Sequence, residues 1–147
     1  MTPLYIFDLD GTLAKIEHRR HFVEGPKKDW PAFFKACVND EPNEPVIRTL
    51  DLLRSTGGDA WIWSGRSDEV RAETELWLHS NVLDYEGLKM REAGDHQPDE
   101  TLKATWLDEM TPYDRARLVA IFDDRDRVVA MWRRKGVACF QVAPGNF

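Results

Sequence analysis

Short apolar runs alternate along the chain with segments in which apolar residues recur at helical spacing. The apolar runs predict buried strands, at Leu4–Phe7, Ala60–Trp63, Leu88–Met90, Leu118–Phe122 and Ala138–Val142. The other segments predict helices with one apolar face, at Val46–Leu53, Val70–Leu78, Asp99–Glu109 and Val128–Trp132. Strands that alternate with helices favour right-handed βαβ units, and therefore an α/β fold whose parallel sheet is covered on both faces.

Residues 15–43 interrupt this alternation directly after the first strand. Three prolines, Pro26, Pro31 and Pro42, divide the segment, and basic and aromatic side chains are frequent in it. Because proline ends regular structure, we expect loops and one or two short helices here. The segment is too short for an independent domain and is predicted to be an insert beside the first strand.

Polar residues of complementary chemistry follow three of the predicted strands. Asp8 and Asp10 come after the first strand, Ser64–Arg66 after the second, and Asp123 and Asp124 after the fourth. The carboxyl ends of parallel strands meet at one edge of a sheet, where open α/β folds bind their ligands. We therefore expect these residues to converge on one site.

Four converging carboxylates favour a site for a hard divalent cation. Without a cation they would repel one another and raise one another's pKa values. Mg²⁺ is commonly held by a few carboxylates together with water and phosphate oxygens, and it neutralises charge on a transferring phosphoryl group. A carboxylate beside the metal can attack phosphorus, and a second can donate and then accept a proton. This pattern predicts phosphoryl chemistry.

The run Asp8–Leu13 reads Asp-Leu-Asp-Gly-Thr-Leu and resembles the nucleophile motif of the haloacid dehalogenase (HAD) superfamily of phosphotransferases. The resemblance implies a HAD-like, Rossmannoid three-layer α/β sandwich with a central parallel sheet. It also implies that residues 15–43 form a small cap insert, and that residues 1–147 are a single phosphatase domain.

The same resemblance assigns roles to the four aspartates. Asp8 matches the nucleophile, which is also a metal ligand. Asp10 matches the general acid/base, whose backbone carbonyl also binds the metal. Asp123 and Asp124 match the acidic pair that completes the Mg²⁺ site.

Two further residues match catalytic positions of the superfamily. Ser64 matches the small hydroxylic residue that hydrogen-bonds the phosphoryl oxygens. Lys103 matches the phosphate-binding lysine, which also offsets the charge of Asp8. The alternative for Lys103 is a solvated lysine on a helix surface.

Nearly the whole chain resembles the phosphatase domain of the phage polynucleotide kinase/3′-phosphatase proteins. The matching segments are Phe7–Lys15, Ser64–Arg66, Met90–Arg91, Gly94–Asp95, Asp99–Lys103, Asp123–Arg125, Val128–Val137 and Cys139–Ala143. The resemblance implies a 3′-phosphorylated DNA or RNA end as substrate. The phosphate-binding loop of the kinase domain does not occur in this chain. The chain is therefore either a separate phosphatase, with a kinase or ligase partner encoded separately, or an excised domain, and the sequence leaves this choice open.

In that subgroup, arginines near the first two motifs bind the substrate. They match Arg66 and either Arg19 or Arg20, and the sequence leaves the choice between the last two open. The planar guanidinium suits phosphate oxygens. Arg91 and Asp95 match a loop beside the site, where Asp95 would orient a basic partner. A structural salt bridge is the alternative for Arg66, Arg91 and Asp95.

Composition bears on the size, the charge and the cellular location of the protein and does not change the predicted chemistry. The 147 residues suffice for one packed core, and a net charge of −6 gives no general attraction to nucleic acid or to anionic membranes. Two cysteines form no disulfide framework, and no apolar run is long enough to cross a membrane. We expect a cytoplasmic protein that is not bound to a membrane; the oligomeric state stays open.

Two alternatives compete with a polynucleotide 3′-phosphatase. One is a small-molecule nucleotidase with the same chemistry, and the other is a module that binds nucleic-acid ends without turnover. The aromatic side chains of the insert are similarly ambiguous, because they could stack on bases or form a small apolar core of their own. These side chains are Phe22, Trp30, Phe33 and Phe34.

Overall fold

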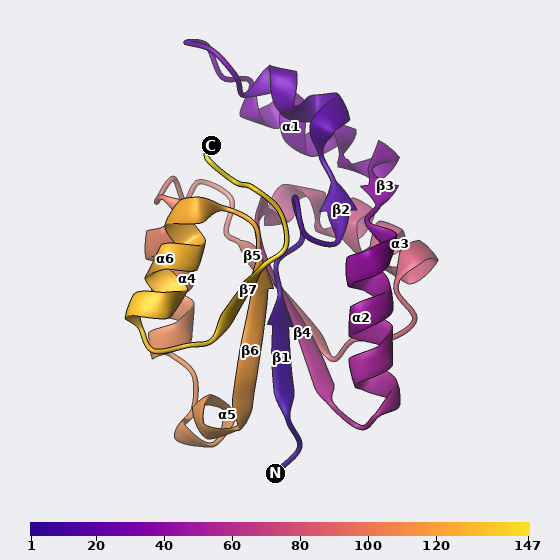
Figure 1. Cartoon of the computed structure of the whole chain (residues 1–147). Coiled ribbons are helices and arrows are strands. Elements are labelled where there is room, and N and C mark those ends of the chain that lie inside the picture. Colours follow the sequence, from indigo (N-terminus) through magenta and orange to yellow (C-terminus); the bar gives the residue numbers. More distant parts are fainter.

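The computed structural model covers residues 1–147 and is built around a five-stranded parallel sheet (Figure 1). Its strand order, β5-β4-β1-β6-β7, puts the first strand at the centre. The strands are β1 (Leu4–Phe7), β4 (Asp59–Ser67), β5 (Gly87–Arg91), β6 (Leu118–Asp123) and β7 (Cys139–Gln141). The predicted α/β fold with a central parallel sheet is confirmed.

Strand β4 is longer than the apolar run that predicts it. Its pairing with β5 continues past Trp63 through a bulge between Ser64 and Ser67. Residues Ser64–Arg66 therefore lie within the strand rather than behind its end. The sequence did not predict this part of the strand because its residues are polar. Pairing with β5, which an apolar pattern does not report, extends the strand here.

Two helices cover each face of the sheet. On one side, α2 (Glu44–Ser55) and α3 (Arg71–Asn81) bury Leu50 and Trp77 against β1 and β4. On the other, α4 (Asp99–Asp108) and α6 (Asp126–Arg134) bury Trp106 and Trp132 against Trp63. Alternate residues of β1 face the two sides, with Phe7 in the first core and Leu4 and Ile6 in the second. The predicted three layers are confirmed.

The sequence pattern did not predict the short helix α5 (Pro112–Arg117). It buries no residue and therefore has no apolar periodicity. The sequence feature that marks this helix is its N-terminal cap. The Thr111 hydroxyl accepts a hydrogen bond from the backbone N–H of Asp114 (3.1 Å), and Pro112 occupies the first turn.

The insert rises above the carboxyl ends of the strands (Figure 1). Its two ends are joined by the antiparallel pair β2 (Ala14–Lys15) and β3 (Glu41–Pro42), which forms a small sheet of its own. Between them lie three short helices, where one or two were expected: η1 (Glu17–Phe22), α1 (Trp30–Lys35) and η2 (Ala36–Asn39). A further 3₁₀ turn, η3 (Asp68–Val70), precedes α3. None of the helices in the chain has the length and apolar character that crossing a bilayer requires.

Candidate active site

The turn after β1 brings Asp8 beside the end of β6. The N–H of Asp8 donates to the carbonyl of Phe122 (2.9 Å), and the Thr12 hydroxyl donates to Asp8 Oδ2 (3.1 Å). Gly11 turns the chain with a φ of +80°, and a Cβ there would lie 1.9 Å from Asp124 Oδ2. Only glycine fits, because the position needs a left-handed backbone and the Asp124 carboxylate occupies the side-chain space.

Three carboxylates and one lysine form what we call the acid cluster: Asp8, Asp123, Asp124 and Lys103. One oxygen from each aspartate lies within 4.8 Å of the others. Lys103 Nζ, from α4, donates to Asp8 Oδ1 (2.7 Å) and to Asp123 Oδ2 (3.3 Å). Lys103 is only 2% exposed, so it is not a solvated surface lysine. Three of the four aspartates that were expected to converge lie in this cluster, whereas the Asp10 carboxylate pairs with Arg19 and Arg66 instead.

The acid cluster carries more negative charge than its lysine balances. Burial, together with Asp123, raises the pKa of Asp8 well above its ordinary value, and the same causes raise the pKa of Asp124 to about 7. Burial would lower the pKa of Lys103, but Asp123 and Asp8 raise it above its usual range. Asp124 Oδ1 is buried without a hydrogen-bond partner. These residues fit a divalent cation, which would supply the missing charge and the missing contact.

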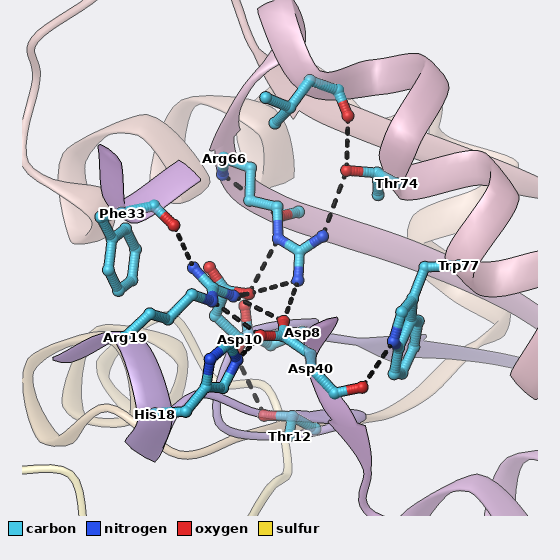
Figure 2. A network of polar contacts seen from close by, with 12 residues as sticks. Asp8, Asp10, Thr12, His18, Arg19, Phe33, Asp40, Arg66, Thr74 and Trp77 are labelled. Atoms are coloured by element: carbon cyan, nitrogen blue, oxygen red, sulfur yellow. Dashed lines mark hydrogen bonds and ion pairs between the residues drawn. The ribbon is translucent and has the colours of Figure 1, made fainter. Parts of the chain in front are cut away.

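A second group of charged residues lies beside the first, and we call it the arginine clamp: Asp10, Asp40, Arg19 and Arg66 (Figure 2). Asp10 Oδ1 accepts from Arg19 Nη2 (2.7 Å) and Arg66 Nε (2.8 Å). Burial would raise the pKa of Asp10, but Arg66 and Arg19 outweigh it and lower the pKa to about 2. Asp10 is therefore ionised at neutral pH.

Asp40 completes the clamp, and sequence reasoning missed it. Its two oxygens accept from Arg19 Nε (2.8 Å), Arg19 Nη2 (2.7 Å) and Arg66 Nη2 (2.9 Å), and its carbonyl accepts from the Trp77 indole (2.9 Å). His18 Nε2 lies 2.6 Å from Asp40 Oδ1. Asp40 thus joins the insert to β4 and α3. No local pattern marks it, since it is a single acid before a short bridge strand.

The structure separates Arg19 from Arg20. Arg19 and Arg66 are fully buried. Arg20 instead lines a cavity of about 620 Å³ that opens above Asp8. Ser64 is also buried, and its Oγ accepts from the N–H of Arg66 (3.1 Å). That Arg19, Arg66 and Ser64 contact substrate oxygens stays a prediction; here they hold Asp10 and the β4 backbone in place.

The loop after β5 is organised by Asp99, a second residue missed from sequence. Arg91 Nη2 donates to Asp99 Oδ1 (2.5 Å) and Arg125 Nη1 to Asp99 Oδ2 (3.0 Å). Asp95, the predicted orienting residue, accepts from Arg91 Nη1 through its backbone carbonyl (3.2 Å), whereas its Oδ1 lies 4.0 Å from the same nitrogen and accepts from the N–H of Gln97 (3.0 Å). Both Arg91 and Asp95 line the same cavity as Asp8. Their predicted part in substrate binding stays a prediction.

Comparisons with known proteins agree with this geometry. The family model described as "Polynucleotide kinase PNKP phosphatase domain" matches residues 2–147. A chain of the Pnkp1/Rnl/Hen1 RNA repair complex is 32% identical with a TM-score of 0.83, and the match covers 99% of this chain and 44% of that one. A chain of a second Pnkp1/Rnl/Hen1 complex is also 32% identical with a TM-score of 0.80, covering 99% of this chain and 48% of that one.

The chain thus spans less than half the length of these two relatives. The fold is shared more widely: a hydrolase from Streptococcus pneumoniae TIGR4 is 16% identical with a TM-score of 0.61, the match covering 97% of this chain and 94% of that one. The family model covers nearly every residue, those of the acid cluster included. The chain therefore belongs to the HAD-type phosphatase domains of the polynucleotide kinase PNKP family.

Proposed function

We propose that this protein is a Mg²⁺-dependent phosphomonoesterase that removes the 3′-phosphate from polynucleotide ends through a phospho-Asp8 intermediate. The observation that carries the proposal is the setting of Asp8. Its carboxylate is held by Lys103 and Thr12 among the other acids, and it lines the cavity. A buried, oriented carboxylate with a cationic neighbour is suited to nucleophilic attack.

The reaction has two steps at phosphorus. In the first, an Asp8 oxygen forms a bond to phosphorus, the bond to the 3′-oxygen breaks, and that oxygen takes up a proton. In the second, water attacks phosphorus, releases the Asp8 carboxylate and loses a proton. Asp10 is ionised and can therefore receive this second proton, but its low pKa makes it a weak base, and Arg19 and Arg66 also oppose the protonated form that the first step needs.

Mg²⁺ would be held by Asp8, Asp123 and Asp124, with the carbonyl of Asp10 as the fourth protein ligand that the family resemblance predicts. When bound, the ion supplies positive charge for the transferring phosphoryl group. The chain's own residues do the rest: Lys103 donates to Asp8 and Asp123 and offsets part of their charge, and Trp132 donates to Asp123 Oδ2 (3.2 Å), which fixes the orientation of that carboxylate.

Family membership and the two similar chains support a polynucleotide end as the substrate. Both of those chains come from Pnkp1/Rnl/Hen1 complexes, and one is described as an RNA repair complex. We therefore propose that the protein acts on nucleic-acid ends beside separately encoded repair partners, and that RNA ends are among its substrates.

Hydrolysis assays test the proposal. Purified protein is given 3′-phosphorylated RNA and DNA oligonucleotides, 3′-mononucleotides and glycerol phosphate, with Mg²⁺ or with a chelator. We expect Mg²⁺-dependent release of phosphate, with oligonucleotides preferred. A strong preference for mononucleotides would indicate the nucleotidase alternative, and end binding without turnover would indicate a binding module.

The nucleophile is tested with Asp8→Asn, which should lower the rate by roughly 10⁴-fold or more because an amide cannot attack phosphorus. Asp108→Asn is the matched control, since Asp108 is exposed and pairs with Lys135 (3.0 Å). A native rate in Asp8→Asn would show that another residue is the nucleophile.

A further inference from the structure

The cavity above the acid cluster extends to the insert, where three aromatic side chains of α1 line it. These are Trp30, Phe33 and Phe34. Asp8 and Asp124 line the other end of the same cavity. A phosphate held at Asp8 would therefore leave the rest of the substrate in a space with an aromatic wall.

The three aromatic residues divide into a core residue and a surface. Phe33 is 5% exposed, and the Arg19 guanidinium lies 4.3 Å from its ring centroid, so packing accounts for it. Trp30 is 42% exposed. Phe34 supports Trp30, since their ring centroids are 5.9 Å apart and the planes differ by 28°. The Trp30 indole also packs edge-on against Phe33, with ring centroids 5.5 Å apart, so the apolar-core interpretation explains Phe33 and the inner contacts of Trp30 but not the exposed part of the indole.

Positive charge accompanies this aromatic surface. Arg20, Lys28, Arg125 and Arg127 all line the cavity, but Arg20 pairs with Glu24 (3.4 Å) and Arg125 with Asp99 (3.0 Å), which leaves Lys28 and Arg127. Lys28 has no carboxylate partner, and the Arg127 guanidinium contacts only the backbone carbonyl of Phe147, at 3.5 Å. A flat aromatic face beside cations not engaged with acids is the combination that binds bases and backbone phosphates of a single strand.

We propose that the Trp30 indole, supported by Phe34, stacks on a nucleobase in the last two nucleotides of the 3′-phosphorylated end. This inference rests on the proposed function and makes Trp30 a specificity-determining residue outside the acid cluster and the arginine clamp. The enzyme then recognises the phosphate together with a base, which explains how an acidic protein selects a polynucleotide end over other phosphate esters.

The test compares substrates that differ only in one base. Three 3′-phosphorylated oligonucleotides are used: one complete, one abasic at the terminal nucleotide and one abasic at the penultimate nucleotide. Glycerol phosphate is the substrate without a base. The proteins are native, Trp30→Ala, Trp30→Phe, and Val38→Ala as a matched control at an exposed position of the insert that does not line the cavity.

Stacking of one base corresponds to a factor of about 5 to 150 in kcat/KM. We expect the native protein to lose such a factor, mainly through KM, on one of the two abasic substrates. Trp30→Ala should lose the same factor on the complete oligonucleotide and no longer distinguish the abasic ones. Trp30→Phe should retain most of the discrimination, and all four proteins should hydrolyse glycerol phosphate alike.

Two results would overturn the inference. One is a native protein that treats complete and abasic oligonucleotides equally, which decides the matter whether or not Trp30→Ala folds. The other is Trp30→Ala with native discrimination, as expected if the indole only meets a protein partner. Failure of the proposed function differs from both, because native protein would then hydrolyse none of the oligonucleotides, whether or not it hydrolyses glycerol phosphate.

Discussion

The acid cluster and the arginine clamp are neighbouring buried groups of charge with opposite balance. The acid cluster sets three carboxylates against one lysine, whereas the clamp sets two carboxylates against two arginines. In the first, pKa values of Asp8 and Asp124 are raised; in the second, that of Asp10 is lowered to about 2. Burial is common to both, so the difference comes from the number of cations each group contains.

This difference in charge balance distinguishes the acid cluster, which suits a cation-binding site, from the arginine clamp, which is a structural ion-pair network. Buried charges without partners are costly, so the acid cluster is in a state that a cation improves. The clamp satisfies its charges internally and connects three parts of the chain: the turn after β1, the insert and β4. It orients Asp10 and anchors the insert above the cavity.

Among the changes that test this comparison, removing the lysine of the acid cluster should have the largest effect on activity. We expect Lys103→Met to lower kcat/KM by about 10²- to 10³-fold. Because Lys103 lowers the pKa of Asp8, its loss raises that pKa further. The ionised nucleophile then forms only at higher pH, so the acid limb of the pH–rate profile should move upward.

The control is Lys135→Met, which removes an exposed lysine that pairs with Asp108. It should leave the profile unchanged. An acid limb at its native position in Lys103→Met would mean that Lys103 does not control the ionisation of the nucleophile.

Unbalancing the clamp should mainly cost stability. Asp40→Asn leaves two buried arginines with one carboxylate, and breaking a buried ion pair costs about 3–5 kcal/mol. For a chain of this size the midpoint of thermal unfolding should fall by roughly 10–20 °C. Asp29→Asn makes the same change at the exposed N-cap of α1 and should be nearly neutral. Equal midpoints for the two variants would contradict the role of Asp40.

Neutralising one acid of the acid cluster should increase stability, in contrast to the loss of stability expected for Asp40→Asn. Without Mg²⁺ at pH 8, Asp124→Asn should be more stable than the native protein by about 2 kcal/mol, because it removes repulsion and the burial of a charge. The raised pKa of Asp124 means that the folded state holds a proton after the unfolded state has lost it. Stability of the metal-free native protein therefore falls as the pH rises from about 4 to about 7.

Chemical denaturation at several pH values measures both effects. The pH dependence should be weaker in Asp124→Asn, and added Mg²⁺ should stabilise the native protein more than the variant. A variant that is less stable than native protein at pH 8 without Mg²⁺ would show that the acid cluster is not strained.

The smallest effect is expected at the edge of the clamp. His18 is partly exposed and contacts Asp40, which keeps its arginines when the imidazole is removed. His18→Ala should cost about 1 kcal/mol in the free energy of unfolding and should leave kcat within about twofold. A loss as large as that of Asp40→Asn would mean that the imidazole, not the two guanidinium groups, supports Asp40.

Sequence reasoning reached the acid cluster because each of its aspartates follows an apolar strand. Parallel pairing then brings the strand ends together, as the register of Phe7 with Phe122 shows. Lys103 could be located only through the family resemblance. Asp40 and Asp99 have no such signal, because their partners are 21 and 26 residues away for Asp40 and 8 and 26 residues away for Asp99.

What the order of residues determined by itself is therefore local: strands from apolar runs, helices from their periodicity, and acids at the strand ends. The tertiary structure alone determined which charged side chains pair with one another. Arg19 rather than Arg20 pairs with Asp10, and Asp40 is the common partner of Arg19 and Arg66. Trp30 is partly exposed, whereas Phe33 is buried. The physical reason is that hydrophobic periodicity acts over a few neighbouring residues, whereas the pairing of buried charges depends on contacts that exist only after the sheet, helices and insert have packed.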